Sequence, residues 1–576
     1  MLNFISFEQK PDSLFLNPFQ DPGVAVMSAP DYLWRPRPRA VIQGFAASEH
    51  PEINTKIEDY VLRVHRHKLF RHAIEFNSFP VVLTDAGFKK SHATAGNKYL
   101  ISGASGIRLL NRYSFENATS QFDPEAELIA YFTRCQTENA GKDLPVFQGD
   151  LPADTAFAIE CRNTFNFYHF VSETLCQLCV VAETPFTGPI YIHYPNRDDK
   201  TRAFAMGFIR ALFPELADRV VFQRTPYHHD RVLGIYNFLS SYYHLPPDQS
   251  AALDAEAPST HYWKGRTATR NSHSVLGGNC VDSNLYKLRE RALRAIEGHD
   301  YSYLPKRFWV GRDDKLSRTR TMKGQDELLD MLTLFGFETI AFEALTPLEQ
   351  IAAMANAEMM ISCHGAGFTN MLFAARNCYA VEIGTLQTAI WRWADFWRLA
   401  NVSQCRYISF FADFNKERPL EEPVFSEESI VPVHLSPQGR AQVMSFVVSV
   451  LGHVPRFTRA TDVARLARQL IAATAYDQAA TLFDTHEALV AGDADLCLLR
   501  AECHKLRNEW GAEFLALHAA WTADTTRWQT LVQILWYARK ADSPKIKTWA
   551  LNLLRADFPA RAAALLAEHA WLRNAR

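Results

Sequence analysis

Residues 362–370, Ser-Cys-His-Gly-Ala-Gly-Phe-Thr-Asn, form the stretch that decides the fold of this chain. They follow the apolar run 359–361 (Met-Met-Ile) and precede the apolar run 371–373 (Met-Leu-Phe). This order predicts a buried strand, a glycine turn and the start of a helix. Such a turn lets the backbone approach a ligand, and the N–H groups at a helix start favour an anion. The pattern therefore indicates a site for a nucleotide diphosphate.

Strands and helices alternate on both sides of this turn, across residues 301–455. The segment 347–357 is predicted to be a helix, with Thr346 as its N-cap, Pro347 at its first position and Glu349 completing a capping box. The alternation predicts a Rossmann-like lobe with a mostly parallel sheet. Its strands are expected at 307–312, 338–342, 359–362, 379–383 and 406–411.

An earlier stretch, residues 96–300, has the same rhythm. Strands are expected at 156–162, 189–194 and 219–223, and helices at 165–182 and 201–212. The fold class is therefore α/β, with two Rossmann-like lobes and a cleft between them where ligands bind.

The two ends of the chain depart from this pattern. Residues 1–95 mix prolines with short strand-like runs, and we assign them no role. Residues 456–576 are alanine-rich, and a motif that starts at Tyr476 recurs 34 residues later at Trp510, with a weaker echo near Trp549. This period is typical of tetratricopeptide repeats. We predict an all-α helical-repeat module there, with a plain helical bundle as the alternative.

The composition argues against several classes of protein. The 576 residues carry a net charge of −2 and no conspicuous lysine or arginine tract, so nucleic acid is not an expected partner. The N-terminus lacks a secretory pattern, and no apolar run approaches the ~18–20 residues that span a bilayer. Most of the 10 cysteines lie in apolar segments, which suits free thiols in a reducing compartment. We expect a cytoplasmic protein, compatible with a peripheral position at the inner membrane face.

Charged and polar residues follow the first strand of the second lobe. Arg312, Ser317 and Arg318 lie where the mouth of the cleft is expected. Arginine binds a diphosphate through planar, bidentate hydrogen bonds. The alternative is a solvated loop whose arginines pair with Asp313 and Asp314.

Glu382 lies in the apolar strand 379–383. A carboxylate at a strand end can bind the ribose hydroxyls of a nucleotide. A partly buried salt bridge is the alternative.

The segment 166–173, Asn-Phe-Tyr-His-Phe-Val-Ser-Glu, is the candidate in the first lobe. On a helix His169 and Glu173 share a face, and Asn166 extends the same polar stripe. Either one of the pair is a general base facing the cleft, or the segment is an amphipathic helix with a hydrated face. The pattern alone favours neither.

No metal site is predicted. Cys176 and Cys179 have CxxC spacing, but they lie within an expected helix and lack a second pair. The run 228–230 (His-His-Asp) has no partner cluster. No Asp-x-Asp follows a strand of the alternating region, which argues weakly against a diphosphate held through a metal ion.

Taken together, five blocks of this sequence resemble glycosyltransferase family 61. They are the segments 166–173, 310–318, 345–354, 362–370 and 381–383, in the family's order. The sequence departs from the family at 317–320, where a denser arginine run is common, and at 323–324, where an asparagine is common.

The resemblance implies an inverting transferase of GT-B architecture that uses a UDP-sugar, with xylose or N-acetylglucosamine as the sugar, and needs neither a metal nor another cofactor. It implies that Asn166, His169 and Glu173 lie on the acceptor side, with Glu173 as base and His169 hydrogen-bonded to it, or the reverse. It assigns to the donor site the residues Arg312, Ser317, Arg318, His364, Gly365, Ala366, Gly367, Asn370 and Glu382.

The expected acceptor is a glycan or glycolipid, as in surface polysaccharide synthesis, and the helical module offers a surface for a protein partner or a second copy of the chain. Two other functions stay open. One is a nucleotide-binding scaffold without turnover, and the other is a different nucleotide-dependent enzyme such as an epimerase.

Overall fold

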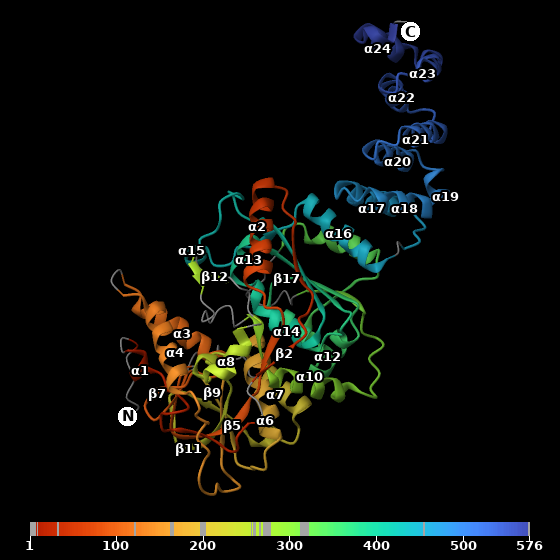
Figure 1. Cartoon of the computed structure of the whole chain (residues 1–576). Helices are drawn as coiled ribbons and strands as arrows, with labels where there is room; N and C mark the ends of the chain where they lie inside the picture. The colour runs from red at the N-terminus through yellow and green to blue at the C-terminus, as the bar shows by residue number, and fades with distance from the viewer. Residues whose placement is uncertain are drawn as a thin grey trace.

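The computed structural model describes residues 7, 10–30, 34–90, 92–119, 122–161, 166–195, 203–254, 256, 261–263, 266–268, 278–311, 322–452 and 455–573. An α/β body of two lobes carries a helical arm that extends away from it (Figure 1). The predicted fold class, α/β lobes followed by an all-α module, is confirmed.

The sheet of the first lobe is half parallel and half antiparallel. Four parallel strands lie in the order β10 (Val220–Arg224), β9 (Ile190–Tyr194), β8 (Phe157–Glu160) and β11 (Tyr227–Tyr236). Antiparallel strands continue the sheet from β11, namely β5 (Phe79–Lys89), β6 (His92–Ala95) and β7 (Lys98–Tyr99), and β1 (Val24–Val26) pairs with β5. The expectation of a mostly parallel sheet therefore fits only the half built after residue 156.

The sheet of the second lobe agrees with the prediction. Its five predicted strands are parallel, in the order β16 (Glu338–Ile340), β15 (Arg307–Val310), β17 (Met359–Cys363), β18 (Tyr379–Thr385) and β19 (Arg406–Phe414). The helix α12 (Pro347–Ala355) begins with the predicted capping box of Thr346 and Glu349. A short antiparallel strand, β20 (Val433–His434), also pairs with β19.

The N-terminal residues are not a separate extension, which corrects the division at residue 95. The strand β3 (Ile42–Ala46) pairs in parallel with β19 of the second lobe, and α2 (Pro51–His67) follows it. The strands β1 and β5 belong to the first lobe. Residues before the predicted alternation therefore contribute strands to both lobes. The edge of a sheet has unpaired backbone hydrogen-bonding groups, and a strand from a distant segment can pair with them.

One hydrophobic core joins the two lobes. It contains Phe170 and Phe208 of the first lobe and Phe368 and Met371 of the second, all at most 1% exposed. The helix α10 (Ser283–Ile296) packs against elements of both lobes, including α7 (Ala203–Leu212) and α12. Shared apolar burial of this kind holds the lobes at a defined separation.

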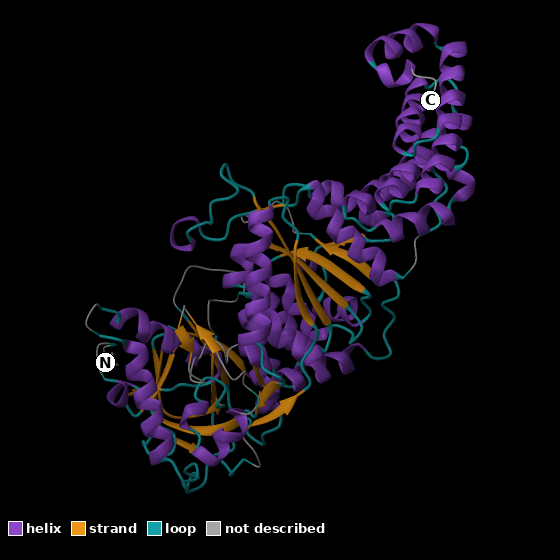
Figure 2. Ribbon diagram, turned by 45° about the horizontal axis from the view of Figure 1, so that its top comes forward, coloured by secondary structure: helices purple, strands orange, loops and turns teal. Residues whose placement is uncertain are grey.

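The arm consists of helix pairs with a regular repeat. Its first helices begin at residues 460, 494 and 528 and its second helices at 476, 510 and 544, so both series advance by 34 residues. The predicted helical repeat is confirmed, and Figure 2 shows the arm curving away from the body. The paired helices are α17 (Ala460–Ala472), α18 (Tyr476–Thr485), α20 (Ala494–Leu506), α21 (Trp510–Ala523), α22 (Trp528–Lys540) and α23 (Pro544–Asp557), and the shorter α19 (Glu487–Val490), α24 (Pro559–Glu568) and α25 (Ala570–Arg573) complete the arm.

Within the described part of the chain, none of the helices has the length and apolar character that crossing a bilayer requires.

Candidate active site between the lobes

The glycine turn lies at the topological switch point of the second sheet. The chain leaves β15 toward β16 on one side and returns to β17 on the other, so the loops after β15 and β17 flank one crevice. Ser362 Oγ donates to the carbonyl oxygen of Val310 at 2.9 Å and ties the two strand ends together. In open α/β sheets ligands bind in such a crevice. Arg312, Ser317 and Arg318, which follow β15, lie outside the described residues.

His364 is held from beneath by Glu382. Its Nδ1 lies 2.5 Å from Glu382 Oε1, and the Glu382 side chain is 0% exposed. Tyr407 Oη donates to Glu382 Oε2, and Ser409 Oγ lies 3.4 Å from the same oxygen. Protein groups thus occupy both carboxylate oxygens, and the predicted ribose contact of Glu382 does not fit this arrangement. The carboxylate instead fixes the His364 ring with its Nδ1–H inward.

The turn itself is accessible, but the residues after it are not. Partial exposure is seen at Gly365, Ala366 and Gly367. The last two begin a 3₁₀ helix, η6 (Ala366–Phe373), which stands in place of the expected α-helical start. Asn370 is 0% exposed, and its side-chain nitrogen donates to Gln350 Oε1 of α12 at 3.4 Å. A ligand in the crevice can therefore touch the turn, whereas Asn370 supports it from within.

The helix that carries His169 and Glu173 is irregular. The expected continuous helix over 165–182 is wrong, because the described part is built from α5 (Phe167–His169), a π-turn η1 (Phe170–Thr174), a 3₁₀ turn η2 (Leu175–Gln177) and α6 (Leu178–Ala182). The apolar pattern continues through all four pieces, so periodicity did not reveal the extra residue of the π-turn. Single π-turns occur frequently at functional sites.

His169 and Glu173 lie side by side, as predicted. His169 Nδ1 is 3.0 Å from Glu173 Oε1, and their side chains are 15% and 7% exposed. Asn166 is the N-cap of α5, and its Oδ1 accepts from the His169 backbone N–H at 3.5 Å. Asn166 therefore begins the helix that presents the pair, and it does not extend a polar stripe.

A contact missed by the sequence reasoning joins this helix to the second lobe. Tyr168 Oη donates to the carbonyl oxygen of Asp395 at 2.7 Å and accepts a hydrogen bond from Arg398 at 2.8 Å. The Phe396 ring centroid lies 5.6 Å from that of Tyr168 and 5.4 Å from that of His364. The two predicted halves of the site therefore meet across a shared aromatic and hydrogen-bonded cluster.

The charges of this cluster act on one another. Removal from water raises the pKa of the Asp395 carboxyl, against the opposing influence of Arg392, His364, Arg398 and His169. Burial lowers the pKa of Arg398, but the neighbouring Tyr168 and Glu173 outweigh it and raise the pKa overall. The Asp395 carboxylate thus interacts electrostatically with both candidate histidines, and the Arg398 guanidinium interacts with Glu173. Nothing in the sequence near Asp395 signals this role, because Tyr168 and His169 come from the first lobe.

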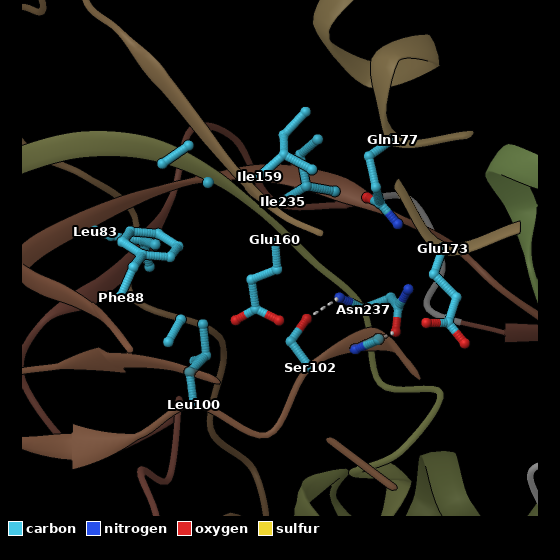
Figure 3. A pocket seen from close by; sticks show the side chains of 14 residues that line it. Leu83, Phe88, Leu100, Ser102, Ile159, Glu160, Glu173, Gln177, Ile235 and Asn237 are labelled. Carbon is cyan, nitrogen blue, oxygen red and sulfur yellow. Dashed lines mark hydrogen bonds between the residues drawn. The ribbon is translucent and has the colours of Figure 1, made fainter. Parts of the chain in front are cut away.

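A pocket opens beside Glu173 in the first lobe (Figure 3). It lies at the carboxyl ends of β8 and β11, and its space is about 620 Å³ when the open region at its mouth is included. Figure 3 shows the carboxylates of Glu160 and Glu173 on either side of Ser102 and Asn237. The pocket therefore adjoins the predicted base.

The other sequence candidates lie elsewhere. Cys176 and Cys179 are buried free thiols, and His228 pairs with Asp85 at 2.7 Å. Among the described residues, the one group with metal-binding spacing is Glu49, Asp413 and His434, which shares no member with the predicted site.

Comparison with known protein families finds a match over the region that contains this site. The family model described as Glycosyltransferase 61 matches residues 167–381. The matched segment begins at α5, includes His169, Glu173 and the His364 turn, and ends within β18. No curated protein matches the chain.

Proposed function

The chain carries a domain of glycosyltransferase family 61, and from that premise we propose an inverting transferase that moves a sugar from a UDP-sugar to a glycan acceptor. The sugar is of the xylose or N-acetylglucosamine type. The observation that carries the proposal is the meeting of the His169–Glu173 pair with the His364 turn around Tyr168 and Phe396. A transferase needs this arrangement, because the acceptor and the donor must react within one enclosed space.

The reaction proceeds in one displacement. The acceptor hydroxyl oxygen forms a bond to the anomeric carbon while the bond from that carbon to the diphosphate oxygen breaks. The hydroxyl proton passes to the base, and the electron pair of the broken bond leaves with UDP. Attack opposite the leaving group inverts the anomeric configuration.

The second lobe holds the donor in this proposal. The turn at 364–367 lies in the switch-point crevice, where backbone N–H groups can stabilise the charge that develops on the diphosphate. The sequence predicts that the diphosphate is also bound by the side chains of Arg312, Ser317 and Arg318. His364, with its Nδ1 engaged by Glu382, directs the other ring nitrogen away from the core.

The first lobe supplies the base. Glu173 is the proposed proton acceptor, and His169, 3.0 Å away, orients it. The reverse assignment uses the same geometry. The carboxylate of Glu173 also interacts with Arg398, whose pKa it helps to raise.

The compartment and the acceptor belong to the same proposal. All ten cysteines are free, which suits a reducing compartment such as the cytoplasm. The reaction there would extend a glycan or a glycolipid precursor of a surface polysaccharide, and the arm would contact a protein partner.

Donor screening tests the proposal. A panel of UDP-, GDP- and CMP-sugars is expected to raise the melting temperature only for the correct UDP-sugar, because a ligand stabilises the state that it binds. Transfer to an acceptor with NMR analysis of the new linkage should then give the inverted anomer. Nucleotide binding without any turnover would favour a scaffold, and retention of configuration would contradict the mechanism.

A further inference from the structure

Asp282 is a buried carboxylate at the start of α10. Its side chain is the N-cap of that helix, where Oδ1 accepts from the Asn284 backbone N–H at 2.9 Å. The residue is 6% exposed. In the described part of the chain no cation forms an ion pair with it, and Arg398 acts on it only from a distance. Serine or asparagine would cap the helix as well without the cost of burying a charge, so capping alone does not account for this carboxylate.

Four donors converge on the two oxygens of Asp282. Oδ1 accepts from Ser78 Oγ at 2.7 Å in addition to the Asn284 N–H. Oδ2 accepts from Gln177 Nε2 at 2.9 Å and from Asn237 Nδ2 at 3.1 Å. An ionised carboxylate can accept from four donors at once, which a neutral amide cannot. Burial raises the pKa of Asp282, and the hydrogen bonds from three of these donors oppose that rise.

Gln177 connects this carboxylate to the helix that carries the proposed base. It ends η2, four residues after Glu173, and Figure 3 shows both side chains on the same side of the pocket. Its amide is held at both ends by the start of α10, because Nε2 donates to Asp282 and Oε1 accepts from Asn284 Nδ2 at 3.5 Å. The turn η2 also packs against α10. The segment is thus attached to α10 directly after the π-turn.

The π-turn is also attached on its other side. Thr174 Oγ1 donates to the carbonyl oxygen of Glu160 at 2.9 Å, which holds the turn against the end of β8. A π-turn contains one residue more than a regular turn, so the direction of its side chains depends on how both of its ends are attached. The carboxylate of Asp282 supplies the attachment on the C-terminal side of Glu173. Arg398 interacts electrostatically with both of these carboxylates.

We propose that Asp282 is a positioning residue for the base, because it acts through Gln177 to hold Glu173 toward His169. The inference rests on the proposed function, since it deepens the assignment of Glu173 in that reaction. The contact to be preserved is the 3.0 Å between His169 Nδ1 and Glu173 Oε1. A catalytic group displaced by about 1 Å can lose about 10²-fold in rate.

Two substitutions and their combination test this role in the full chain. Asp282→Asn turns one acceptor into a donor, so two N–H groups face each other within the network. Gln177→Glu places two carboxylates next to each other. The combined variant exchanges donor and acceptor at the same contact and keeps the net charge, so it should restore the hydrogen bond.

Two further variants complete the set. Gln177→Met removes only the amide, and it serves if Asp282→Asn does not fold. Asp462→Asn is the matched control, because Asp462 is equally buried but lies in the arm, where it pairs with Arg459 at 2.9 Å. Melting curves identify the folded variants.

Hydrogen exchange of residues 167–182 measures the attachment without any substrate. We expect faster exchange of this segment in each variant altered at position 177 or 282 alone, and recovery in the combined variant. In the transfer assay kcat should fall by roughly 10–100-fold in those variants, while KM for the nucleotide sugar changes by less than about threefold. The combined variant should regain most of kcat, and Asp462→Asn should change neither quantity.

Three results would overturn the assignment. They are unchanged exchange of 167–182 in a folded variant altered at 177 or 282 alone, no recovery in the folded combined variant, and an equal fall of kcat in Asp462→Asn. If the unaltered chain turns over no nucleotide sugar, the proposed function fails. The exchange data then still decide whether Asp282 holds the π-turn.

Discussion

Glu382 lies directly beneath His364, with 2.5 Å between Glu382 Oε1 and His364 Nδ1 and no exposed surface on the carboxylate. This contact joins a buried residue of β18 to the glycine turn, which lies within the segment that the family model matches. It makes Glu382 a positioning residue, since it acts through the histidine ring.

Glu382→Gln should therefore impair the reaction, although residue 382 contacts neither substrate. The loss of a charge-assisted hydrogen bond predicts a decrease of roughly 10–100-fold in kcat/KM. Because the substitution removes the carboxylate that orients the His364 ring, the pH profile of kcat/KM should also change. Steady-state kinetics across pH measure both effects. A variant with lower thermal stability but an unchanged pH profile would indicate a purely structural role.

Glu173→Gln tests the proposed base. The amide cannot accept the acceptor proton, so kcat should fall by roughly 10²–10⁴, while UDP still raises the melting temperature as in the unaltered chain. His169→Gln should lower the rate less, because it only orients the carboxylate. Full activity in Glu173→Gln would exclude the glutamate, and a larger loss in His169→Gln would favour the reverse assignment.

Tyr168→Phe tests the hydrogen bonds between the lobes. The substitution removes the donor to the Asp395 carbonyl oxygen and the acceptor for Arg398, so a partly buried cation loses a partner. We expect a loss of stability of about 1–3 kcal/mol and a lower transfer rate. Chemical denaturation and initial-rate measurements check this. Phe167→Leu serves as a packing control that should retain more of the activity, because the Phe167 ring packs on Phe204 and Phe208 and takes no part in these hydrogen bonds.

The acid stability of the first lobe should depend on His193 and His229. Burial lowers the pKa of His193 to about 3 and that of His229 to about 4, and their Nε2 atoms lie 2.9 Å apart. The unfolded chain binds protons near pH 6.5, so stability is full above that pH and declines as the pH falls toward the folded pKa values. His193 alone should cost on the order of 2 kcal/mol at pH 5.

His193→Phe keeps the aromatic packing on Phe88 and removes this titration. Its melting temperature should therefore fall less than that of the unaltered chain between pH 7 and pH 5. An identical decline in both proteins would assign the acid sensitivity to other groups.

The second lobe was predictable because its signals are local. The apolar run before residue 362, the capping box at Thr346 and the glycine turn each specify a short element, and the parallel order follows from their alternation. The hairpin of β6 and β7 also carries a local signal in its sequence. Gly96 and Asn97, both with positive φ, form the two-residue turn that favours a hairpin.

The rest of the site depends on contacts between distant positions. Tyr168 and Asp395 are separated by 227 positions, and the partners of Glu382 become apparent only when β18 and β19 pair. The order of β8 and β11, which creates the first-lobe pocket, is likewise a property of the sheet. A single sequence indicates which residues can do chemistry, whereas the pairing of the strands determines which of them meet.

The regular step of the arm has a mechanical consequence. Its first helix pair and part of the second share an apolar core with the second lobe, whereas the rest of the second pair and the third pair pack in a separate core. Repeats that contact only their neighbours transmit position along the stack. A molecule bound at the distal end would therefore lie at a fixed distance from the catalytic centre. Each added or deleted helix pair would change that distance by the length of one repeat.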